Sequence, residues 1–168
     1  MIGDFGVGKT SLIRRFVDRQ FSDHYLSTVG VKISRKVIEF KKQNQAEMLN
    51  LQLIIWDIEG SAKFKAIVPS YLKGAIGAII VGDLTRQETI NHLTDHIQLF
   101  LSINSKASIV VAFNKSDLIE SEQSNLLFQL NFLTRHKQVS AAYLTSAKTG
   151  KNVDRIFHTL AHQIIKPE

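Results

Sequence analysis

The first ten residues contain a segment whose composition suits the binding of nucleotide phosphates. Residues 3–10 read GDFGVGKT and match the pattern G-x-x-x-x-G-K-[ST]. Glycines in such a loop let backbone N–H groups turn inward around phosphates, and the helix that follows adds its positive N-terminus. We expect Lys9 to reach the β- and γ-phosphates and the Thr10 hydroxyl to ligate Mg²⁺. The segment therefore predicts a loop that binds nucleotide phosphates.

Two further segments carry residue types that suit a Mg²⁺ and γ-phosphate site. Asp57 and Gly60 form a D-x-x-G pattern directly after an apolar stretch that ends at Trp56. A carboxylate at that position can hold Mg²⁺, and the Gly60 N–H can meet the γ-phosphate. Thr28 lies in a polar stretch, where a threonine is usually a turn or cap residue. If this loop closes over the nucleotide, Thr28 supplies a second hydroxyl to Mg²⁺ and makes the loop sensitive to the γ-phosphate.

Residues 114–117 read NKSD, a pattern suited to the recognition of guanine. The Asp117 carboxylate can accept hydrogen bonds from guanine N1–H and from the N2 amine, a pair of donors that adenine lacks. Leaving these groups unpaired is costly, so the contact discriminates strongly between bases. Residues 146–148, SAK, can complete the pocket with a backbone N–H to guanine O6. The two patterns together predict a guanine-nucleotide site.

Strand-like and helix-like apolar patterns alternate along the chain, without repeats or linkers. Strands are expected at 31–40, 49–56, 76–81, 109–113 and 141–144, with a hairpin loop at 41–47. Helices are expected after the phosphate loop and around 90–101, 126–133 and 153–165. This alternation predicts an α/β fold with a mostly parallel sheet and helices on both faces, with ligands at the loops that leave the carboxyl ends of the strands. We expect residues 1–168 to form one domain.

The composition argues against several other classes of protein. The chain has no cysteine, which excludes disulfides and thiolate metal sites. No apolar stretch is long enough to cross a bilayer, and none reads as a signal peptide. The net charge of +6 is scattered along the chain, so we do not expect nucleic-acid binding. His92 and His96 stand four residues apart on a predicted helix, where a solvated face is a better interpretation than a metal site.

These segments together resemble the Ras-like small GTPases, and most of all their Rab branch. The resemblance rests on GDFGVGKTSLIRRF, STVGV, WDIEG, FNKSDL and TSAKTGKNVDRIF, and it covers essentially the whole chain. It implies a six-stranded α/β sheet, GTP and GDP as ligands, Mg²⁺, and two switch segments. The first switch would contain Tyr25 and Thr28, and the second would run from Asp57 to about Leu72. The resemblance also implies that Phe21 packs against the guanine ring.

Two residues depart from the pattern of the resembled family in ways that bear on hydrolysis. Ser61 follows the D-x-x-G segment, where the family has a glutamine that orients the attacking water. Phe5 replaces a small residue that faces the γ-phosphate, and its ring can crowd the water and any arginine supplied by an activating protein. Both changes predict slow hydrolysis. The alternative is a hydrolysis-deficient GTP-binding scaffold that acts in protein interaction, whereas an ATP-using P-loop kinase is disfavoured by the NKSD segment.

Both ends of the chain also differ from the resembled family. A full strand should precede the phosphate loop, but only Met1 and Ile2 do so, and we therefore expect the first strand to be largely absent. Residues 166–168 include no cysteine for prenylation. We expect a cytoplasmic protein with no lipid anchor in this chain, peripheral at membranes if a lipidated tail lies outside it. A prokaryotic relative of the family also fits these ends.

The expected roles can be stated residue by residue. Catalytic roles fall to Lys9, Gly60 and Ser61, and Mg²⁺ ligands are Thr10, Thr28 and Asp57. The expected nucleotide contacts are Phe5, Gly6, Val7, Gly8, Lys9, Thr10, Ser11, Phe21, Tyr25, Thr28, Gly60, Asn114, Lys115, Asp117, Ser146, Ala147 and Lys148. As the resemblance implies, effector, exchange and activating proteins are expected to bind from Tyr25 to Gly30 and from Asp57 to Leu72.

Overall fold

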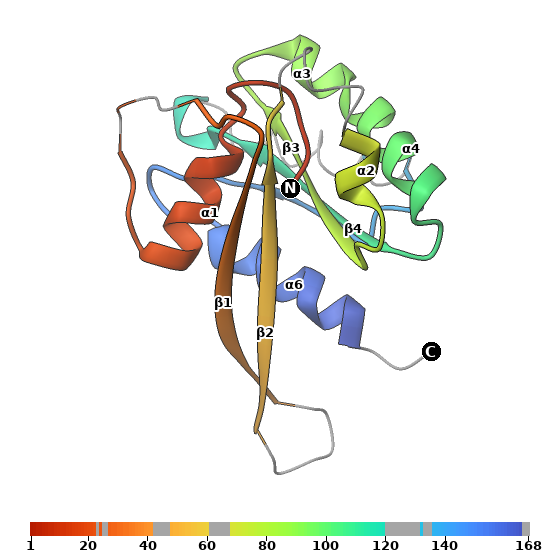
Figure 1. The fold of residues 1–168 in the computed structure, drawn as a ribbon. Helices are drawn as coiled ribbons and strands as arrows, with labels where there is room; N and C mark the ends of the chain where they lie inside the picture. The colour runs from red at the N-terminus through yellow and green to blue at the C-terminus, as the bar shows by residue number, and fades with distance from the viewer. Residues whose placement is uncertain are drawn as a thin grey trace.

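Helices and strands are interspersed along the described part of the chain, with β1 and β2 consecutive in a hairpin (Figure 1). The computed structural model describes residues 1–22, 24, 27–41, 48–60, 68–119, 132 and 136–165. The elements are α1 (Lys9–Asp18), β1 (Val31–Lys41), β2 (Met48–Ile58), α2 (Val68–Leu72), β3 (Gly77–Asp83), α3 (Gln87–Asn91), α4 (Leu93–Ile103), β4 (Ser108–Asn114), the 3₁₀ turn η2 (Ser116–Leu118), β5 (Ala141–Leu144) and α6 (Val153–Ile165). The five predicted strands are confirmed, with bounds that differ by at most two residues at either end.

The strands form two sheets in the described part of the chain. Strands β1 and β2 pair antiparallel as a long hairpin, which extends beyond the rest of the molecule in Figure 1. Strands β3, β4 and β5 form a parallel sheet in that order. Parallel strands buried on both faces should be continuously apolar. Accordingly, every residue of β4 after Ser108 is buried.

Met1 and Ile2 lie between the hairpin and the parallel sheet. Ile2 forms an isolated parallel bridge with Ile80, and the Met1 amine donates a hydrogen bond to the carbonyl of Trp56. The first strand of the expected six-stranded sheet is thus reduced to one bridge, as predicted, but the five strands of the described residues form two sheets and not one. The physical reason is that two residues can form a bridge between neighbouring strands but not a ladder of hydrogen bonds.

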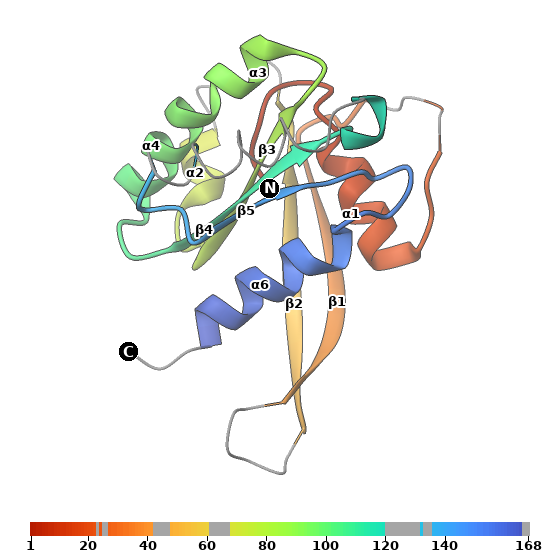
Figure 2. The same cartoon turned by 180° about the vertical axis from the view of Figure 1, so that it is seen from behind.

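Helices cover both faces of the sheet, as predicted. Side chains alternate along β3: Ile79 and Val81 pack with α1 and α6, whereas Ala78 and Ile80 pack with α2, α3 and α4. Figures 1 and 2 show α2, α3 and α4 gathered on one side of the strands, away from α1 and α6. No helix of the described residues is long and apolar enough to cross a membrane.

Three helical segments differ from the sequence prediction. The helix expected around 90–101 is two helices, α3 and α4, separated by the single residue His92. Helix α2 was not predicted, because five residues are too few to show a helical period. The helix expected at 126–133 lies outside the described residues, apart from Phe132.

Candidate functional site

The phosphate loop leaves Ile2 at the sheet and enters helix α1 at Lys9. Lys9 is only 6% exposed, and its Nζ donates hydrogen bonds to the carbonyls of Gly3 and Asp4, both at 2.8 Å. Burial lowers the pKa of Lys9 to about 8, although the neighbouring carboxylates of Asp57 and Asp4 oppose this shift. A buried cation held by two carbonyls is suited to meeting phosphate oxygens, which would restore the charge compensation that water no longer provides.

Gly8 is required at the junction between the loop and helix α1. Its φ is +100°, a conformation that costs a residue with a Cβ of the order of 1–2 kcal/mol. A Cβ on Gly8 would also lie 2.2 Å from Asn114 Nδ2. The absence of a side chain thus lets Asn114, at the end of β4, approach the phosphate loop closely.

Three oxygen-bearing side chains converge beside the start of α1. The Thr10 hydroxyl lies 2.6 Å from the Thr28 hydroxyl and 2.5 Å from Asp57 Oδ2, and Thr28 lies 3.4 Å from the same carboxylate oxygen. The second oxygen of Asp57 is buried and has no hydrogen-bond partner within the described residues. Hydroxyl and carboxylate oxygens are the ligands that Mg²⁺ prefers, and an orphaned buried carboxylate oxygen needs a cation or donor. The residues present therefore fit Mg²⁺.

The other end of the site is built by the last residue of β4 and the turn that follows it. Asn114 is 2% exposed; its Nδ2 donates to the carbonyl of Val7 at 2.9 Å, and its Oδ1 accepts from the hydroxyl of Thr145 and the N–H of Ala147, each at 3.3 Å. Its side chain thus ties the phosphate loop to the segment after β5. Asp117 follows in the turn η2.

A cavity of about 300 Å³ joins the two ends of the site. Most of the predicted nucleotide contacts line it: Phe5, Gly6, Gly8, Lys9, Thr10, Ser11, Phe21, Thr28, Gly60, Asn114, Lys115, Asp117, Ala147 and Lys148. Val7 and Ser146 are fully buried instead, and the Ser146 hydroxyl accepts a hydrogen bond from Thr149 N–H. Tyr25 and Ser61 lie outside the described residues. The structure therefore gathers residues separated by more than a hundred positions around one space.

The chain is similar throughout its length to proteins that are already classified. Residues 1–166 match the sequence model of the Ras family. The chain belongs to the Ras family. It is 32% identical over 166 residues to the GTP-binding protein ypt4 of Schizosaccharomyces pombe, an alignment that covers 98% of this chain and 70% of that protein. It is also 32% identical over 167 residues to the Ras-related protein Rab-13 of Mesocricetus auratus, with 98% of this chain and 78% of that protein covered.

This Ras-family protein has cavity residues that the sequence did not single out, namely Arg14, Ser22, His24, Glu59 and Leu118. The position of Arg14 in the site could be predicted from the sequence, because Arg14 stands four residues after Thr10 and so lies on the same face of the helix. Glu59 also links two segments of the site: its carboxylate accepts from Gly30 N–H at 2.7 Å, and its own N–H donates to the Gly30 carbonyl at 2.9 Å.

The prediction of a solvated face holds for His92, which is exposed, but not for His96, whose side chain is only 18% exposed. Both side chains contact Asp4 of the phosphate loop, at 2.6 Å from His92 Nδ1 and 2.9 Å from His96 Nε2. The fold brings these residues together across about ninety positions, which no local pattern indicates. No cluster of three or more His, Cys, Asp or Glu side chains that could hold a metal exists in the described ranges.

The buried carboxylate of Asp83 supports this Ras-family site by pairing with two basic side chains. Asp83, at the end of β3, is 0% exposed; its Oδ2 accepts from Lys115 Nζ at 2.6 Å and from Arg86 Nε at 3.0 Å. Arg86 Nη2 in turn donates to the Phe5 carbonyl at 2.8 Å. Burial raises the pKa of Asp83, but hydrogen bonds from Lys115, Thr85 and Arg86 outweigh burial and hold the pKa below its ordinary value.

We expect Asp83→Asn to lower the free energy of unfolding at pH 7 by about 2–3 kcal/mol, because the Lys115 and Arg86 cations lose their charged acceptor. A carboxyl whose folded pKa is depressed stabilises the fold above its unfolded pKa of about 3.9, and this contribution disappears as the pH falls through the folded pKa. Urea unfolding of the parent chain and the variant should therefore differ at pH 7 and converge in acid. Asp95→Asn, on the exposed side of α4, is the control. Equal stability of the Asp83 variant and the parent at pH 7 would contradict this account.

Proposed function

We propose that this Ras-family GTP-binding switch protein holds GTP or GDP together with Mg²⁺ in the cavity between the phosphate loop and the segment 114–117, and that it hydrolyses GTP slowly. The observation that carries the proposal is the connection between the two ends of the cavity. Asn114 donates to the phosphate-loop carbonyl of Val7, so the segment that would read guanine is fixed relative to the loop that would hold the phosphates. With the phosphate loop at one end of the cavity and residues 114–117 at the other, one nucleotide can span the cavity.

The phosphates would be bound by the backbone N–H groups of the loop and by Lys9, since both sets of donors border the cavity. Mg²⁺ would be held by Thr10, Thr28 and Asp57, and when bound it would neutralise charge on the β- and γ-phosphates. Gly60 N–H would meet the γ-phosphate. Asp117 would accept from the guanine edge, Phe21 would pack on the ring, and Lys115 would be oriented by its ion pair with Asp83.

The two segments proposed to change with the nucleotide are in contact through Gly30 and Glu59. Their paired hydrogen bonds link the segment that contains Thr28 to the one that contains Gly60. Loss of the γ-phosphate would remove the ligand that holds both, so both would loosen together. Effector, exchange and activating proteins would then distinguish the two states through Tyr25 to Gly30 and Asp57 to Leu72. The rest of residues 1–168 would act as a single domain that supports these segments.

Slow hydrolysis is proposed from Phe5 and Ser61. The Phe5 side chain borders the cavity and the residue is 45% exposed, so its ring lies near the space that the γ-phosphate would occupy. A serine is too short to orient the attacking water as a glutamine does. The second candidate, a GTP-binding scaffold without useful hydrolysis, is favoured by the same two residues and differs only in the rate.

We expect Ser61→Gln to raise the single-turnover rate of GTP hydrolysis by about 10- to 100-fold, because a positioned side chain that aids proton transfer or water orientation contributes on that order or more. Phe5→Ser combined with Ser61→Gln should be at least as fast as Ser61→Gln. The measurement is phosphate release from preloaded GTP with Mg²⁺ present. Ser102→Gln, an exposed position on α4, is the matched control and should leave the rate unchanged. If the parent chain hydrolyses GTP as fast as the Ser61→Gln variant, the proposal of slow hydrolysis fails; no hydrolysis by either would favour the scaffold.

A further inference from the structure

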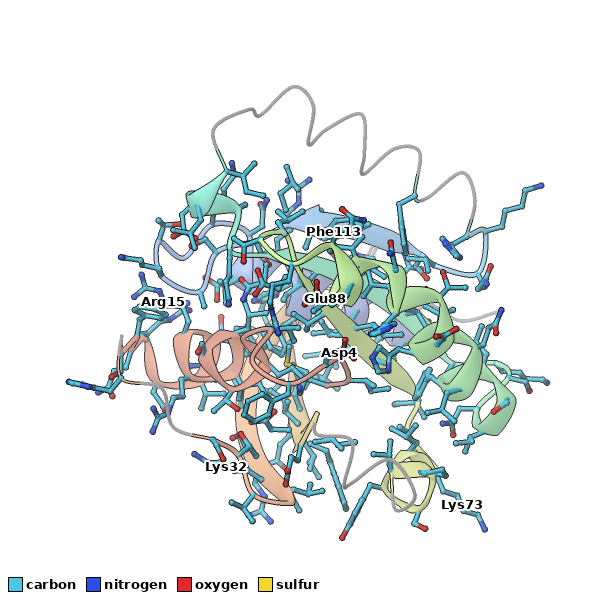
Figure 3. The ribbon with its side chains drawn as sticks, turned by 90° about the horizontal axis from the view of Figure 1, so that it is seen from above. Asp4, Arg15, Lys32, Lys73, Glu88 and Phe113 are labelled. Atoms are coloured by element: carbon cyan, nitrogen blue, oxygen red, sulfur yellow. The ribbon has the colours of Figure 1, made fainter. Side chains whose placement is uncertain are left out.

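The side chain of Asp4 leaves the phosphate loop toward helix α4. Its Oδ2 lies 2.6 Å from His92 Nδ1 and its Oδ1 lies 2.9 Å from His96 Nε2, so each carboxylate oxygen has its own histidine. Figure 3 shows the labelled Asp4 between helices α1 and α4. Because an ionised carboxylate can only accept, both histidines must donate, His92 from Nδ1 and His96 from Nε2. We call these three residues the Asp4 clamp.

Other contacts of the loop meet at the same residue. The Asp4 carbonyl accepts a hydrogen bond from Lys9 Nζ. Gly60 packs so closely on this backbone that a Cβ there would lie 2.5 Å from the carbonyl carbon of Asp4. The Asp4 backbone is thus held on the cavity side by Lys9 and Gly60, while its carboxylate is held on the other side by α4. Movement of Asp4 would disturb both the lysine and the glycine that face the phosphates.

The charge of Asp4 makes its orientation matter for an anionic ligand. A carboxylate in a phosphate-binding loop repels phosphates, and the repulsion grows as it turns toward them. Burial raises the pKa of Asp4, but hydrogen bonds from His92 and His96 outweigh burial and keep the pKa below its ordinary value, so the charge persists. The histidine donors direct this charge to α4. Neither histidine lines the cavity, so neither touches the nucleotide directly.

We propose that His92 and His96 are positioning residues for nucleotide binding: by holding the Asp4 carboxylate against helix α4, they fix the phosphate loop in its binding conformation and slow the release of nucleotide. This inference rests on the proposed function, since it concerns the same cavity. We expect the hydrogen bond from His96 to contribute more than that from His92. The His96 side chain is 18% exposed, whereas the His92 side chain is 50% exposed, so water competes more for the contact of His92 with Asp4.

The test is the rate at which a fluorescent GDP analogue leaves the full chain when excess GDP is added. His92→Ala/His96→Ala leaves the loop sequence intact and should release the analogue about tenfold faster than the parent, because two charge-assisted hydrogen bonds are lost. His96→Ala alone should have the larger share of that effect. His92→Asn/His96→Gln places amide N–H groups where the ring N–H groups were, and its release rate should stay within about twofold of the parent.

Arg19→Ala is the control, because it removes an exposed ion pair with Asp154 at the far end of α1 and should leave release unchanged. The clamp is overturned if the double alanine variant releases the analogue at the parent rate, or if the Asn/Gln variant is as fast as the double alanine variant. A parent-like release rate in the Asn/Gln variant would show that the hydrogen bonds to Asp4 matter, and not a general loss of stability. Thermal unfolding of the same variants measures their stability directly. A parent chain that retains no GDP would overturn the proposed function and this inference together, whereas equal release from a parent that does retain GDP overturns the clamp alone.

Discussion

Asp117→Asn is expected to weaken the binding of GDP and GTP by about 10³- to 10⁴-fold while improving the binding of xanthosine nucleotides. The carboxylate can accept from both N1–H and the N2 amine of guanine. An asparagine offers one acceptor and one donor, so its amide would face the guanine amine with a second donor and leave both unpaired. In a desolvated contact this mismatch is more costly than the loss of the contact itself.

Xanthine carries a carbonyl in place of the guanine N2 amine, so the asparagine N–H finds an acceptor there. Equilibrium competition of GDP, xanthosine diphosphate and a fluorescent GDP analogue would measure both changes. Asp18→Asn, the same change on the exposed end of α1, should leave all affinities as they were. A variant at position 117 that keeps the parent preference for GDP would mean that Asp117 does not read the base.

Lys9→Met is expected to weaken GDP and GTP binding by about 10²- to 10³-fold. The methionine has a similar length but no charge. Two unit charges about 4 Å apart attract by about 4 kcal/mol at an effective dielectric constant near 20, which corresponds to about 10³ in affinity. The carbonyls of Gly3 and Asp4 would also lose their donor, which loosens the loop. The measurement is the dissociation constant of a fluorescent GDP analogue in the presence of Mg²⁺.

Lys106→Met is the matched control for this change. Lys106 is exposed in the turn between α4 and β4 and does not line the cavity, so the substitution removes the same charge away from the site. Its affinity should equal that of the parent chain. If Lys9→Met and Lys106→Met had equal affinities for GDP, then Lys9 would not contact phosphates, and the assignment of the loop would be wrong.

The parts of the site that the sequence predicted are local patterns with strong physical constraints. A glycine-rich turn before an amphipathic helix, an aspartate after an apolar strand and a short apolar run before NKSD each depend on neighbouring residues alone. Parallel sheet topology then brings the carboxyl ends of the strands to one edge. For this reason Lys9, Thr10, Asp57 and Asp117 could be grouped without any structure, and the distances among Thr10, Thr28 and Asp57 agree with that grouping.

The parts that could not be predicted are contacts between distant positions and side chains with more than one use. Asn114 lines the cavity, but its amide also bonds to Val7, Thr145 and Ala147, a supporting role that the NKSD pattern does not indicate. Asp83 gave no signal, because an aspartate at the end of a strand is ordinarily a turn residue. The Asp4 clamp joins the phosphate loop to a helix face about ninety residues away, and helical spacing alone cannot identify the partner of that face.

Competition between GDP and ADP tests whether the cavity selects a guanine nucleotide. The chain, loaded with a fluorescent GDP analogue and Mg²⁺, would be titrated separately with GDP and with ADP. We expect displacement by GDP at concentrations comparable to the analogue, and at least about 10³-fold more ADP for the same displacement, because adenine leaves the Asp117 acceptors unpaired. Displacement by GDP and ADP at similar concentrations would mean that the cavity does not select guanine.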